Sequence, residues 1–282
     1  MTNDNTLHSL SIGFIGAGNM AKAIIGGLIQ GGFPATQLWA SGPTQSELDY
    51  LNTHYAMHTT QDNPKLVHEV DVLIFAVKPD RLKTVVTELK AVIHTKKTLL
   101  ISIAAGISTQ AIYNWLDDVT HQIPLVRTMP NTPALINQGI TGVYPACELS
   151  PTNREIIHTI LSAIGNYVWL EKEDWLDIVT GLSGSGPAFI FYILEAMIAK
   201  ASALGLPEAI ATELALKTCA GSANLALNSQ KDLAELRHNV TSKGGTTFAG
   251  LQKAEELNLS QSIGQIINAA VERSKAMREQ NN

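Results

Sequence analysis

The first thirty residues contain the pattern that most restricts the fold: a short apolar run, a glycine-rich turn and then a helix. Residues 11–15 predict a buried strand, and residues 21–30 predict a helix. The turn between them has the form Gly16-x-Gly18-x-x-Ala21. Gly16 permits the tight turn, Gly18 lets a pyrophosphate approach the backbone, and Ala21 is small enough for the helix to pack against the strand. This arrangement predicts a Rossmann-type domain that binds a nicotinamide dinucleotide at the N-terminus of the helix.

A glycine turn of this form also occurs without a ligand, so the motif alone is a weak indication. Its place between a strand and a helix near the N-terminus makes it specific. We therefore expect the whole turn to contact the pyrophosphate: Gly16, Ala17, Gly18, Asn19, Met20 and Ala21.

Strands and helices alternate through the first 170 residues. Further strands are predicted at residues 38–41, 70–77, 98–104, 122–129, 140–144 and 167–170. Helices are predicted between them at residues 47–55, 80–93, 108–116 and 151–164. This alternation predicts an α/β fold with a doubly wound, mostly parallel sheet.

After about residue 170 no further strand is predicted. Helices are expected at residues 187–204, 207–228, 231–238, 247–258 and 262–279. We therefore expect a Rossmann dinucleotide-binding domain at residues 1–170 and an all-helical domain at residues 171–282. A length of 282 residues agrees with two domains of about 150 residues each.

The helix predicted at residues 187–204 is apolar around nearly its whole circumference, which is typical of a helix buried on all sides. The next helix is rich in alanine, which allows close helix packing. A domain of this size rarely buries two such helices by itself, so we expect a second subunit to cover them. A self-contained bundle is the alternative.

Composition excludes several classes of function. The net charge of −5 argues against nucleic-acid binding. Residues 1–10 are polar and predict no secretory signal, and no apolar run of about 18 residues predicts a membrane span. Cys147 and Cys219 lie far apart without metal-ligand spacing, as expected for reduced thiols in a cytoplasmic protein.

The segment after the second strand bears on the choice of cofactor. NAD-binding enzymes usually place an acidic residue there for the ribose 2′-hydroxyl, but this chain has no carboxylate before Glu47. Ser41 and Thr44 can donate hydrogen bonds to a 2′-phosphate, which favours NADP(H). No arginine accompanies them, and ordinary turn chemistry explains both residues equally well.

Two more segments lie where ligands of a parallel sheet bind, at the carboxyl ends of strands. They are expected to line the ribose and nicotinamide, although generic strand–helix loops look similar: Ala76, Val77, Lys78 and Pro79, and Ala104, Ala105 and Gly106. A further segment, residues 129–133, places Asn131 between two prolines in a rigid polar loop.

A second glycine turn precedes the helix predicted at residues 247–258. Its sequence is Ser242-Lys243-Gly244-Gly245-Thr246-Thr247. Backbone N–H groups of such a turn bind anions, a carboxylate as well as a phosphate. The alternative is that a threonine hydroxyl caps the helix.

Together these motifs resemble the pyrroline-5-carboxylate reductase family. The resemblance extends from about Ile12 to about Ala276. Six segments carry it, in order: residues 13–21, 76–79, 102–106, 129–133, 184–188 and 244–247.

The resemblance implies a Rossmann domain followed by a helical dimerisation domain, in homodimers that often form larger rings. It implies that NADPH reduces the ring imine of 1-pyrroline-5-carboxylate to L-proline, with NADH accepted by some members. Ser41 and Asn63 would contact the adenosine ribose phosphate. The substrate residues would be Asn131, Val240, Ser242, Gly244, Gly245 and Thr246, with Thr247 as the catalytic residue facing the ring nitrogen. Lys243 departs from the proline usual in the family.

Two other classes of function remain open from the residues alone. One is a different dehydrogenase with the same Rossmann-plus-helices plan. The other is a non-catalytic protein that senses the NADP(H) ratio, which would not need the turn at residues 244–247.

Overall fold

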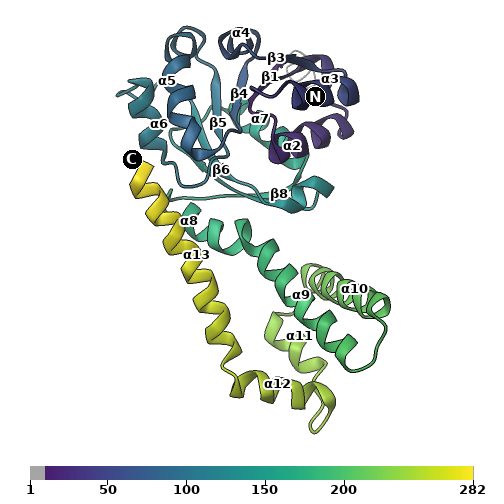
Figure 1. The fold of residues 1–282 in the computed structure, drawn as a ribbon. Helices are drawn as coiled ribbons and strands as arrows, with labels where there is room; N and C mark the ends of the chain where they lie inside the picture. Colours follow the sequence, from purple (N-terminus) through teal and green to yellow (C-terminus); the bar gives the residue numbers. More distant parts are fainter. Residues whose placement is uncertain (1–9, 282) are drawn as a thin grey trace. The chain divides into compact units, whose positions relative to one another are not determined.

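A computed structural model describes residues 10–281 of the chain (Figure 1). It contains two compact units: an α/β unit, Met1–Ser185 together with Ala270–Asn282, and a helical unit, Gly186–Ala269. Most of the segment expected to carry no secretory signal, residues 1–9, lies outside the described residues.

The described residues of the α/β unit form one eight-stranded sheet in the order β3-β2-β1-β4-β5-β6-β7-β8. The strands are β1 (Ile12–Ile15), β2 (Leu38–Ser41), β3 (His58–Thr60), β4 (Val72–Phe75), β5 (Leu99–Ser102), β6 (Leu125–Met129), β7 (Gly139–Pro145) and β8 (Gly165–Trp169). β6 and β7 pair antiparallel, whereas the other neighbours pair parallel. The predicted doubly wound, mostly parallel sheet is confirmed.

The central strands are apolar throughout because helices cover both faces of the sheet. Side chains alternate between the faces: Phe14 enters one hydrophobic cluster and Ile15 the other. The helical segments of the unit are α2 (Asn19–Gln30), η1 (Ala35–Gln37), α3 (Gln45–Tyr55), α4 (Asn63–Glu69), α5 (Pro79–Lys96), α6 (Thr109–Leu116), η2 (Thr132–Ile136), α7 (Pro151–Ser162), α8 (Trp175–Val179) and the π-helix η3 (Thr180–Gly184). Helices α2, α3 and α7 contribute to the first cluster, and α4, α5 and α6 to the second.

Among the short elements that were not predicted, β3 and α4 bear on the predicted cofactor residues. β3 is a three-residue edge strand, His58-Thr59-Thr60, with no apolar run to mark it. α4 has only seven residues, but its start carries a signal: Asp62 caps it by accepting a hydrogen bond from the N–H of Lys65, and a proline occupies its first turn. Both elements matter because Asn63, a predicted cofactor residue, begins α4.

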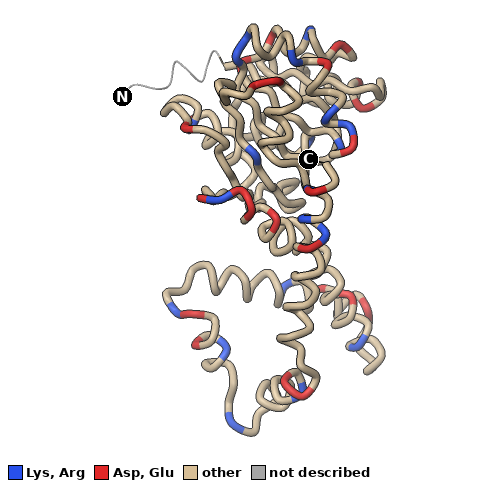
Figure 2. Tube along the Cα trace, turned by 90° about the vertical axis from the view of Figure 1, so that its left-hand side faces the viewer, with Lys and Arg blue, Asp and Glu red and all other residues tan. Residues whose placement is uncertain are grey.

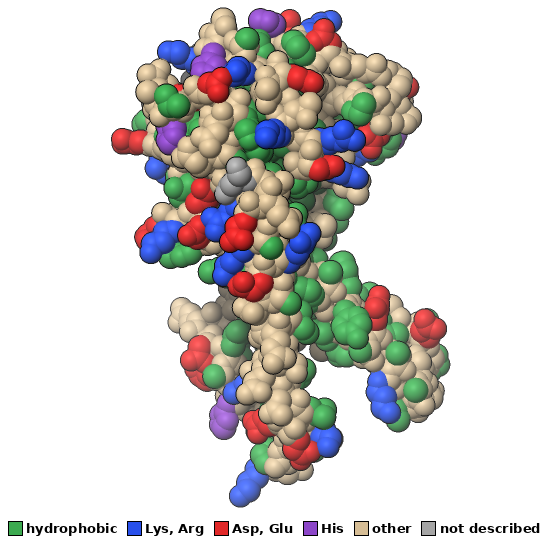
Figure 3. All heavy atoms as spheres, turned by 60° about the vertical axis from the view of Figure 1, so that its left-hand side comes forward, with side chains coloured by type: hydrophobic (Ala, Val, Ile, Leu, Met, Phe, Trp, Pro, Cys, Tyr) green, Lys and Arg blue, Asp and Glu red, His purple; other side chains and the backbone are tan. Residues whose placement is uncertain are grey.

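The helical unit contains α9 (Gly186–Ala203), α10 (Glu208–Leu227), α11 (Leu233–Asn239), α12 (Thr246–Glu256) and the first part of α13 (Leu259–Asn281). Large apolar side chains of α9 are exposed, among them Phe191 at 59% and Tyr192 at 72%. Figure 3 shows apolar side chains gathered on the surface of this unit. Within the single chain these side chains lack the cover expected for a helix that is apolar on all sides.

The helical stretch Trp175–Ala203 has 29 residues and a mean hydropathy of 1.4, enough by length and composition to cross a membrane. No membrane span was predicted from the sequence, because the apolar residues 188–199 include Glu195 and are followed by Lys200. The apolar surface of α9 therefore needs a partner, either another protein surface or a lipid.

The division of the chain differs from the one expected at residue 170. β8 ends at Trp169 and the described elements after it are helical, so the secondary structure changes near that point. The compact units follow contacts instead: Ala270–Asn282, assigned from the sequence to the helical domain, belongs to the α/β unit. The hydrogen bonds involved join residues 97 to 175 positions apart, which no local sequence pattern can indicate.

Candidate cofactor and substrate sites

The glycine-rich turn after β1 has the geometry of a phosphate-binding loop. Gly16 has a φ of 111°, and a Cβ there would lie 2.5 Å from the carbonyl oxygen of Ala76. Its N–H donates to the carbonyl of Ser41 at 2.8 Å. Only glycine fits this position without strain, because both the backbone angle and the contact exclude a side chain.

Gly18 plays a different part in the same turn. It is the N-cap of α2, and no side chain among the described residues caps that helix. A Cβ on Gly18 would have no described atom within 4 Å, so the space beside it is open. Ala21 is 1% exposed and packs in the core. The turn thus offers uncapped helix N–H groups and room for an anion, as the sequence predicts.

Four predicted cofactor segments meet at one edge of the sheet. β2, β1, β4 and β5 are consecutive parallel neighbours, so their carboxyl ends lie side by side (Figure 1). The segments that follow them are residues 41–44, 16–21, 76–79 and 104–106. The strand order reverses between β1 and β4: β2 and β3 follow β1 on one side, and β5 and β6 follow β4 on the other. Such folds bind dinucleotides at this switch point.

At the end of this edge predicted to face the adenosine, a hydrogen bond joins two predicted cofactor residues. The hydroxyl of Ser41, fully buried, donates to Oδ1 of Asn63 at 2.6 Å. Ser41 therefore orients Asn63, whose side-chain NH₂ remains the donor at this end. Thr44 is exposed at the N-cap of α3, and its hydroxyl does not cap that helix. A direct contact of Ser41 with a 2′-phosphate stays a prediction.

One cation at this end was missed by the sequence analysis. Lys22, in the first turns of α2, lies 3.8 Å from the carboxylate of Glu47 and over the ring of Tyr50. Lys22 thus offsets the nearest carboxylate after β2, which favours the binding of a phosphate there. The sequence feature that could have identified Lys22 is its position four residues after Gly18.

The segments expected near the nicotinamide differ in exposure. Ala76 and Val77 are half-buried, Lys78 is an exposed N-cap, and Pro79 opens α5. Ala104 is buried, and Gly106 has a φ of 67°. That a planar ring lies against these small side chains stays a prediction.

Asn131 has a structural task. Its Oδ1 accepts from the N–H of Ile140 at 2.9 Å, and its Nδ2 donates to the carbonyl of Ser183 at 3.2 Å. With 8% of its surface exposed, it holds the end of β6, the start of β7 and η3 together. A substrate contact by Asn131 stays a prediction.

The second glycine turn lies in the helical unit. Gly244 has a φ of 74°, and Gly245 is the N-cap of α12. A Cβ on Gly245 would lie 2.4 Å from Oγ of Ser242, so a larger residue there would force that serine side chain to turn away. Thr246 and Thr247 are the first two residues of the helix and are exposed.

The alternative interpretation of this turn, a threonine cap, is wrong. The N-cap is Gly245, and no described side chain accepts a hydrogen bond from the start of α12. The first N–H groups of the helix and two threonine hydroxyls are therefore presented to solvent. Lys243 and Val240 are exposed beside them, Val240 at the C-cap of α11.

Among residues 10–281, no group of three or more His, Cys, Asp or Glu side chains is placed to hold a metal ion. Basic and acidic residues are interspersed along the chain (Figure 2).

Comparisons with known proteins bear on both units. Residues 173–277 match the model described as pyrroline-5-carboxylate reductase dimerisation, and residues 11–106 match that of NADP oxidoreductase, coenzyme F420-dependent. The pyrroline-5-carboxylate reductase of Pseudomonas aeruginosa is 39% identical over 269 residues, covering 95% of this chain and 97% of that protein. The corresponding protein of Vibrio alginolyticus is 37% identical over 94% of this chain and 97% of its own length.

Solved structures agree. A pyrroline-5-carboxylate reductase from Coxiella burnetii superimposes with a TM-score of 0.89 and 36% identity, covering 95% of this chain and 98% of that one. The Plasmodium falciparum pyrroline carboxylate reductase, solved with NADP bound, gives a TM-score of 0.85 at 27% identity, covering 96% and 99%.

Proposed function

This chain belongs to the pyrroline-5-carboxylate reductase family, and we propose that it reduces the ring imine of 1-pyrroline-5-carboxylate to L-proline with NADPH, the last step of proline biosynthesis. One observation carries the proposal: a dinucleotide-binding edge and an uncapped glycine turn occur in one chain. The first suits a nicotinamide cofactor, and the second suits a substrate that carries a carboxylate.

The cofactor edge fits NADPH at both ends. Open space beside Gly18 and the uncapped start of α2 suit the pyrophosphate. The amide of Asn63, oriented by Ser41, and the cation of Lys22 suit a 2′-phosphate. NADH is the second candidate, since its ribose would use the same turn without the phosphate contacts.

The turn before α12 would bind the substrate carboxylate through the N–H groups of Gly245 and Thr246. The ammonium of Lys243 adds positive charge beside it. Val240 and Ser242 would shape the rest of the pocket. Such contacts fix the ring, and orientation of the reacting atoms supplies much of the rate enhancement in this kind of reaction.

The reaction requires little acid–base catalysis from the protein. Bound NADPH supplies a hydride to the imine carbon, while the electron pair of the C=N bond passes to nitrogen. The ring imine is basic enough to be partly protonated near neutral pH, and its iminium is a good hydride acceptor. We assign Thr247 the role of hydrogen-bond donor to the ring nitrogen, relaying a proton from water.

Assembly and location are part of the proposal. A second copy of the chain would cover the exposed apolar side chains of α9, giving a homodimer that assembles further into a ring. With that surface covered, α9 does not enter a membrane and the enzyme works in the cytoplasm. Analytical ultracentrifugation at micromolar protein tests this, because a monomer without detergent would contradict it.

An NADPH-oxidation assay with 1-pyrroline-5-carboxylate, repeated with NADH, tests the activity. We expect NADPH to be consumed in proportion to the L-proline formed. NADPH binding without turnover would favour the sensor, and turnover with other imines or 2-hydroxy acids alone would favour another dehydrogenase. Either result would overturn the proposed activity.

A further inference from the structure

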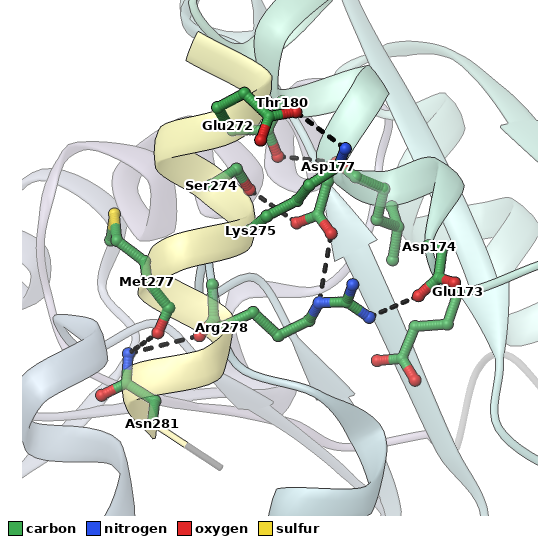
Figure 4. Close-up of polar contacts among 12 residues, drawn as sticks. Glu173, Asp174, Asp177, Thr180, Glu272, Ser274, Lys275, Met277, Arg278 and Asn281 are labelled. Carbon is green, nitrogen blue, oxygen red and sulfur yellow. Dashed lines mark hydrogen bonds and ion pairs between the residues drawn. The ribbon is translucent and has the colours of Figure 1, made fainter. Parts of the chain in front are cut away.

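The last twelve described residues, 270–281 of α13, form a C-terminal anchor on the α/β unit (Figure 4). Val271 and Ser274 are buried there. The dimerisation match ends at residue 277 and the NADP oxidoreductase match at residue 106, so neither assigns this contact a role.

Charged groups fix the rotation of the anchor. Arg278 points between two carboxylates (Figure 4): it forms an ion pair with Asp174, and its Nε lies 3.1 Å from Oδ2 of Asp177. Asp177 is fully buried and also accepts from the hydroxyl of Ser274 at 2.7 Å. Burial alone lowers the pKa of Arg278, but its bond to Asp174 and both carboxylate charges raise the pKa overall.

The anchor touches the loop expected to line the nicotinamide. The carbonyl of Gly106 accepts a hydrogen bond from Nδ2 of Asn281 at 3.3 Å. Nδ2 of Asn281 also donates to the carbonyl of Met277 at 2.7 Å, which fixes the amide. A Cβ on Gly106 would lie 2.8 Å from Cβ of Met277, so the loop and the helix are in close contact.

A neighbouring residue holds the start of α6, the helix that follows the same loop. The carboxylate of Glu173 accepts from the N–H of Thr109 at 2.7 Å and from its hydroxyl at 2.8 Å. It also pairs with the buried guanidinium of Arg127 at 3.0 Å. Glu173 directly precedes Asp174, the partner of Arg278. The loop at residues 104–108 is thus held at Gly106 by Asn281, and the helix that follows it is held at Thr109 by Glu173.

We propose that the C-terminal anchor positions the nicotinamide-lining loop, with Asn281 as the residue that holds Gly106. The inference rests on the proposed function. Asn281 touches neither cofactor nor substrate in this role; it acts through the loop. Its loss therefore changes the NADPH-dependent steps and leaves recognition of the substrate carboxylate, in the helical unit, unchanged.

Asn281→Ala tests the proposal, and Asn228→Ala is a matched control. Asn228 also ends a helix and donates from Nδ2 to the carbonyl four residues earlier, Asn224, at 2.8 Å, but it belongs to the helical unit. We expect Asn281→Ala to lower kcat/KM for NADPH roughly 2- to 10-fold, the range for one hydrogen bond. KM for 1-pyrroline-5-carboxylate and the unfolding temperature should stay at wild-type values, and Asn228→Ala should change none of these.

A fluorescence titration with NADPH supplies a readout apart from turnover. A weaker NADPH affinity in Asn281→Ala, with rescue of affinity in Asn281→Gln, supports the proposal. Equal values for Asn281→Ala and Asn228→Ala in both measurements overturn it. An equal fold-change in the kinetic parameters for NADPH and for 1-pyrroline-5-carboxylate also overturns it. A wild-type enzyme inactive on 1-pyrroline-5-carboxylate refutes the proposed function instead, and the NADPH titration still decides the role of Asn281.

Discussion

Two glycines of the same turn should respond to alanine in opposite ways. Gly18 has a φ of −73°, which any residue adopts, and the space beside it is open. Gly18→Ala therefore costs the fold below about 1 kcal/mol, as for an alanine placed at an N-cap. The added methyl group, however, enters the space where the pyrophosphate would lie.

The loss of affinity follows from the contacts that the methyl group displaces. A hydrogen bond to a charged group contributes about 1.5–3 kcal/mol. Losing one such bond weakens NADPH binding roughly 10- to 150-fold. A fluorescence titration of Gly18→Ala with NADPH should show this, while calorimetry should show an unfolding temperature within about 4 °C of wild type.

Gly16→Ala should act in the opposite way, mainly by destabilising the fold. Its positive φ costs about 1–2 kcal/mol for a residue with a side chain. The Cβ would also lie 2.5 Å from a backbone oxygen, so the turn must shift. The unfolding temperature should fall by roughly 4 °C or more. Wild-type NADPH affinity in Gly18→Ala, or an undisturbed fold in Gly16→Ala, would refute the assignment of the turn.

Three further outcomes are expected. Thr247→Ala should lower kcat/KM by about 10²-fold or less, with Thr247→Ser retaining most of the rate; unchanged steady-state kinetics would remove Thr247 from the mechanism. Asn63→Ala should weaken NADPH more than NADH in parallel titrations, and an equal loss for both would place Asn63 away from the 2′-phosphate. Burial raises the pKa of Tyr113 above its ordinary value of 10.0, so the folded state keeps a proton that the unfolded state releases, and stability should fall as pH rises above 10. Urea unfolding at alkaline pH should show a shallower decline in Tyr113→Phe.

Local patterns were sufficient to predict the cofactor edge. The turn at residues 16–21 and the strands beside it follow from glycine spacing and apolar runs, because each depends on residues close in sequence. Parallel strands then place the segments after β2, β4 and β5 at the same edge. The polar edge strand β3 left no such pattern, because its position depends on pairing with β2.

Other features depend on contacts between distant residues. The hydroxyl of Ser41 was expected to face a phosphate, but its bond to Asn63 spans 22 positions. The bond between Asn281 and Gly106 spans 175 positions. No local sequence pattern indicates which distant residue either side chain contacts, so only the folded structure identifies these two hydrogen bonds.

The return of α13 to the sheet makes the helical unit an insertion within the α/β unit. The nucleotide-binding part of this chain is therefore not a contiguous fragment. A truncation after residue 185 would remove Asn281 and Met277 from beside Gly106. A truncation after residue 170 would also remove the carboxylates that hold Arg278. A faithful minimal version would join the two separated pieces, residues up to 185 and from 270, with a short linker. Because Asn281 contacts Gly106, an affinity tag is better placed away from the carboxyl end of α13.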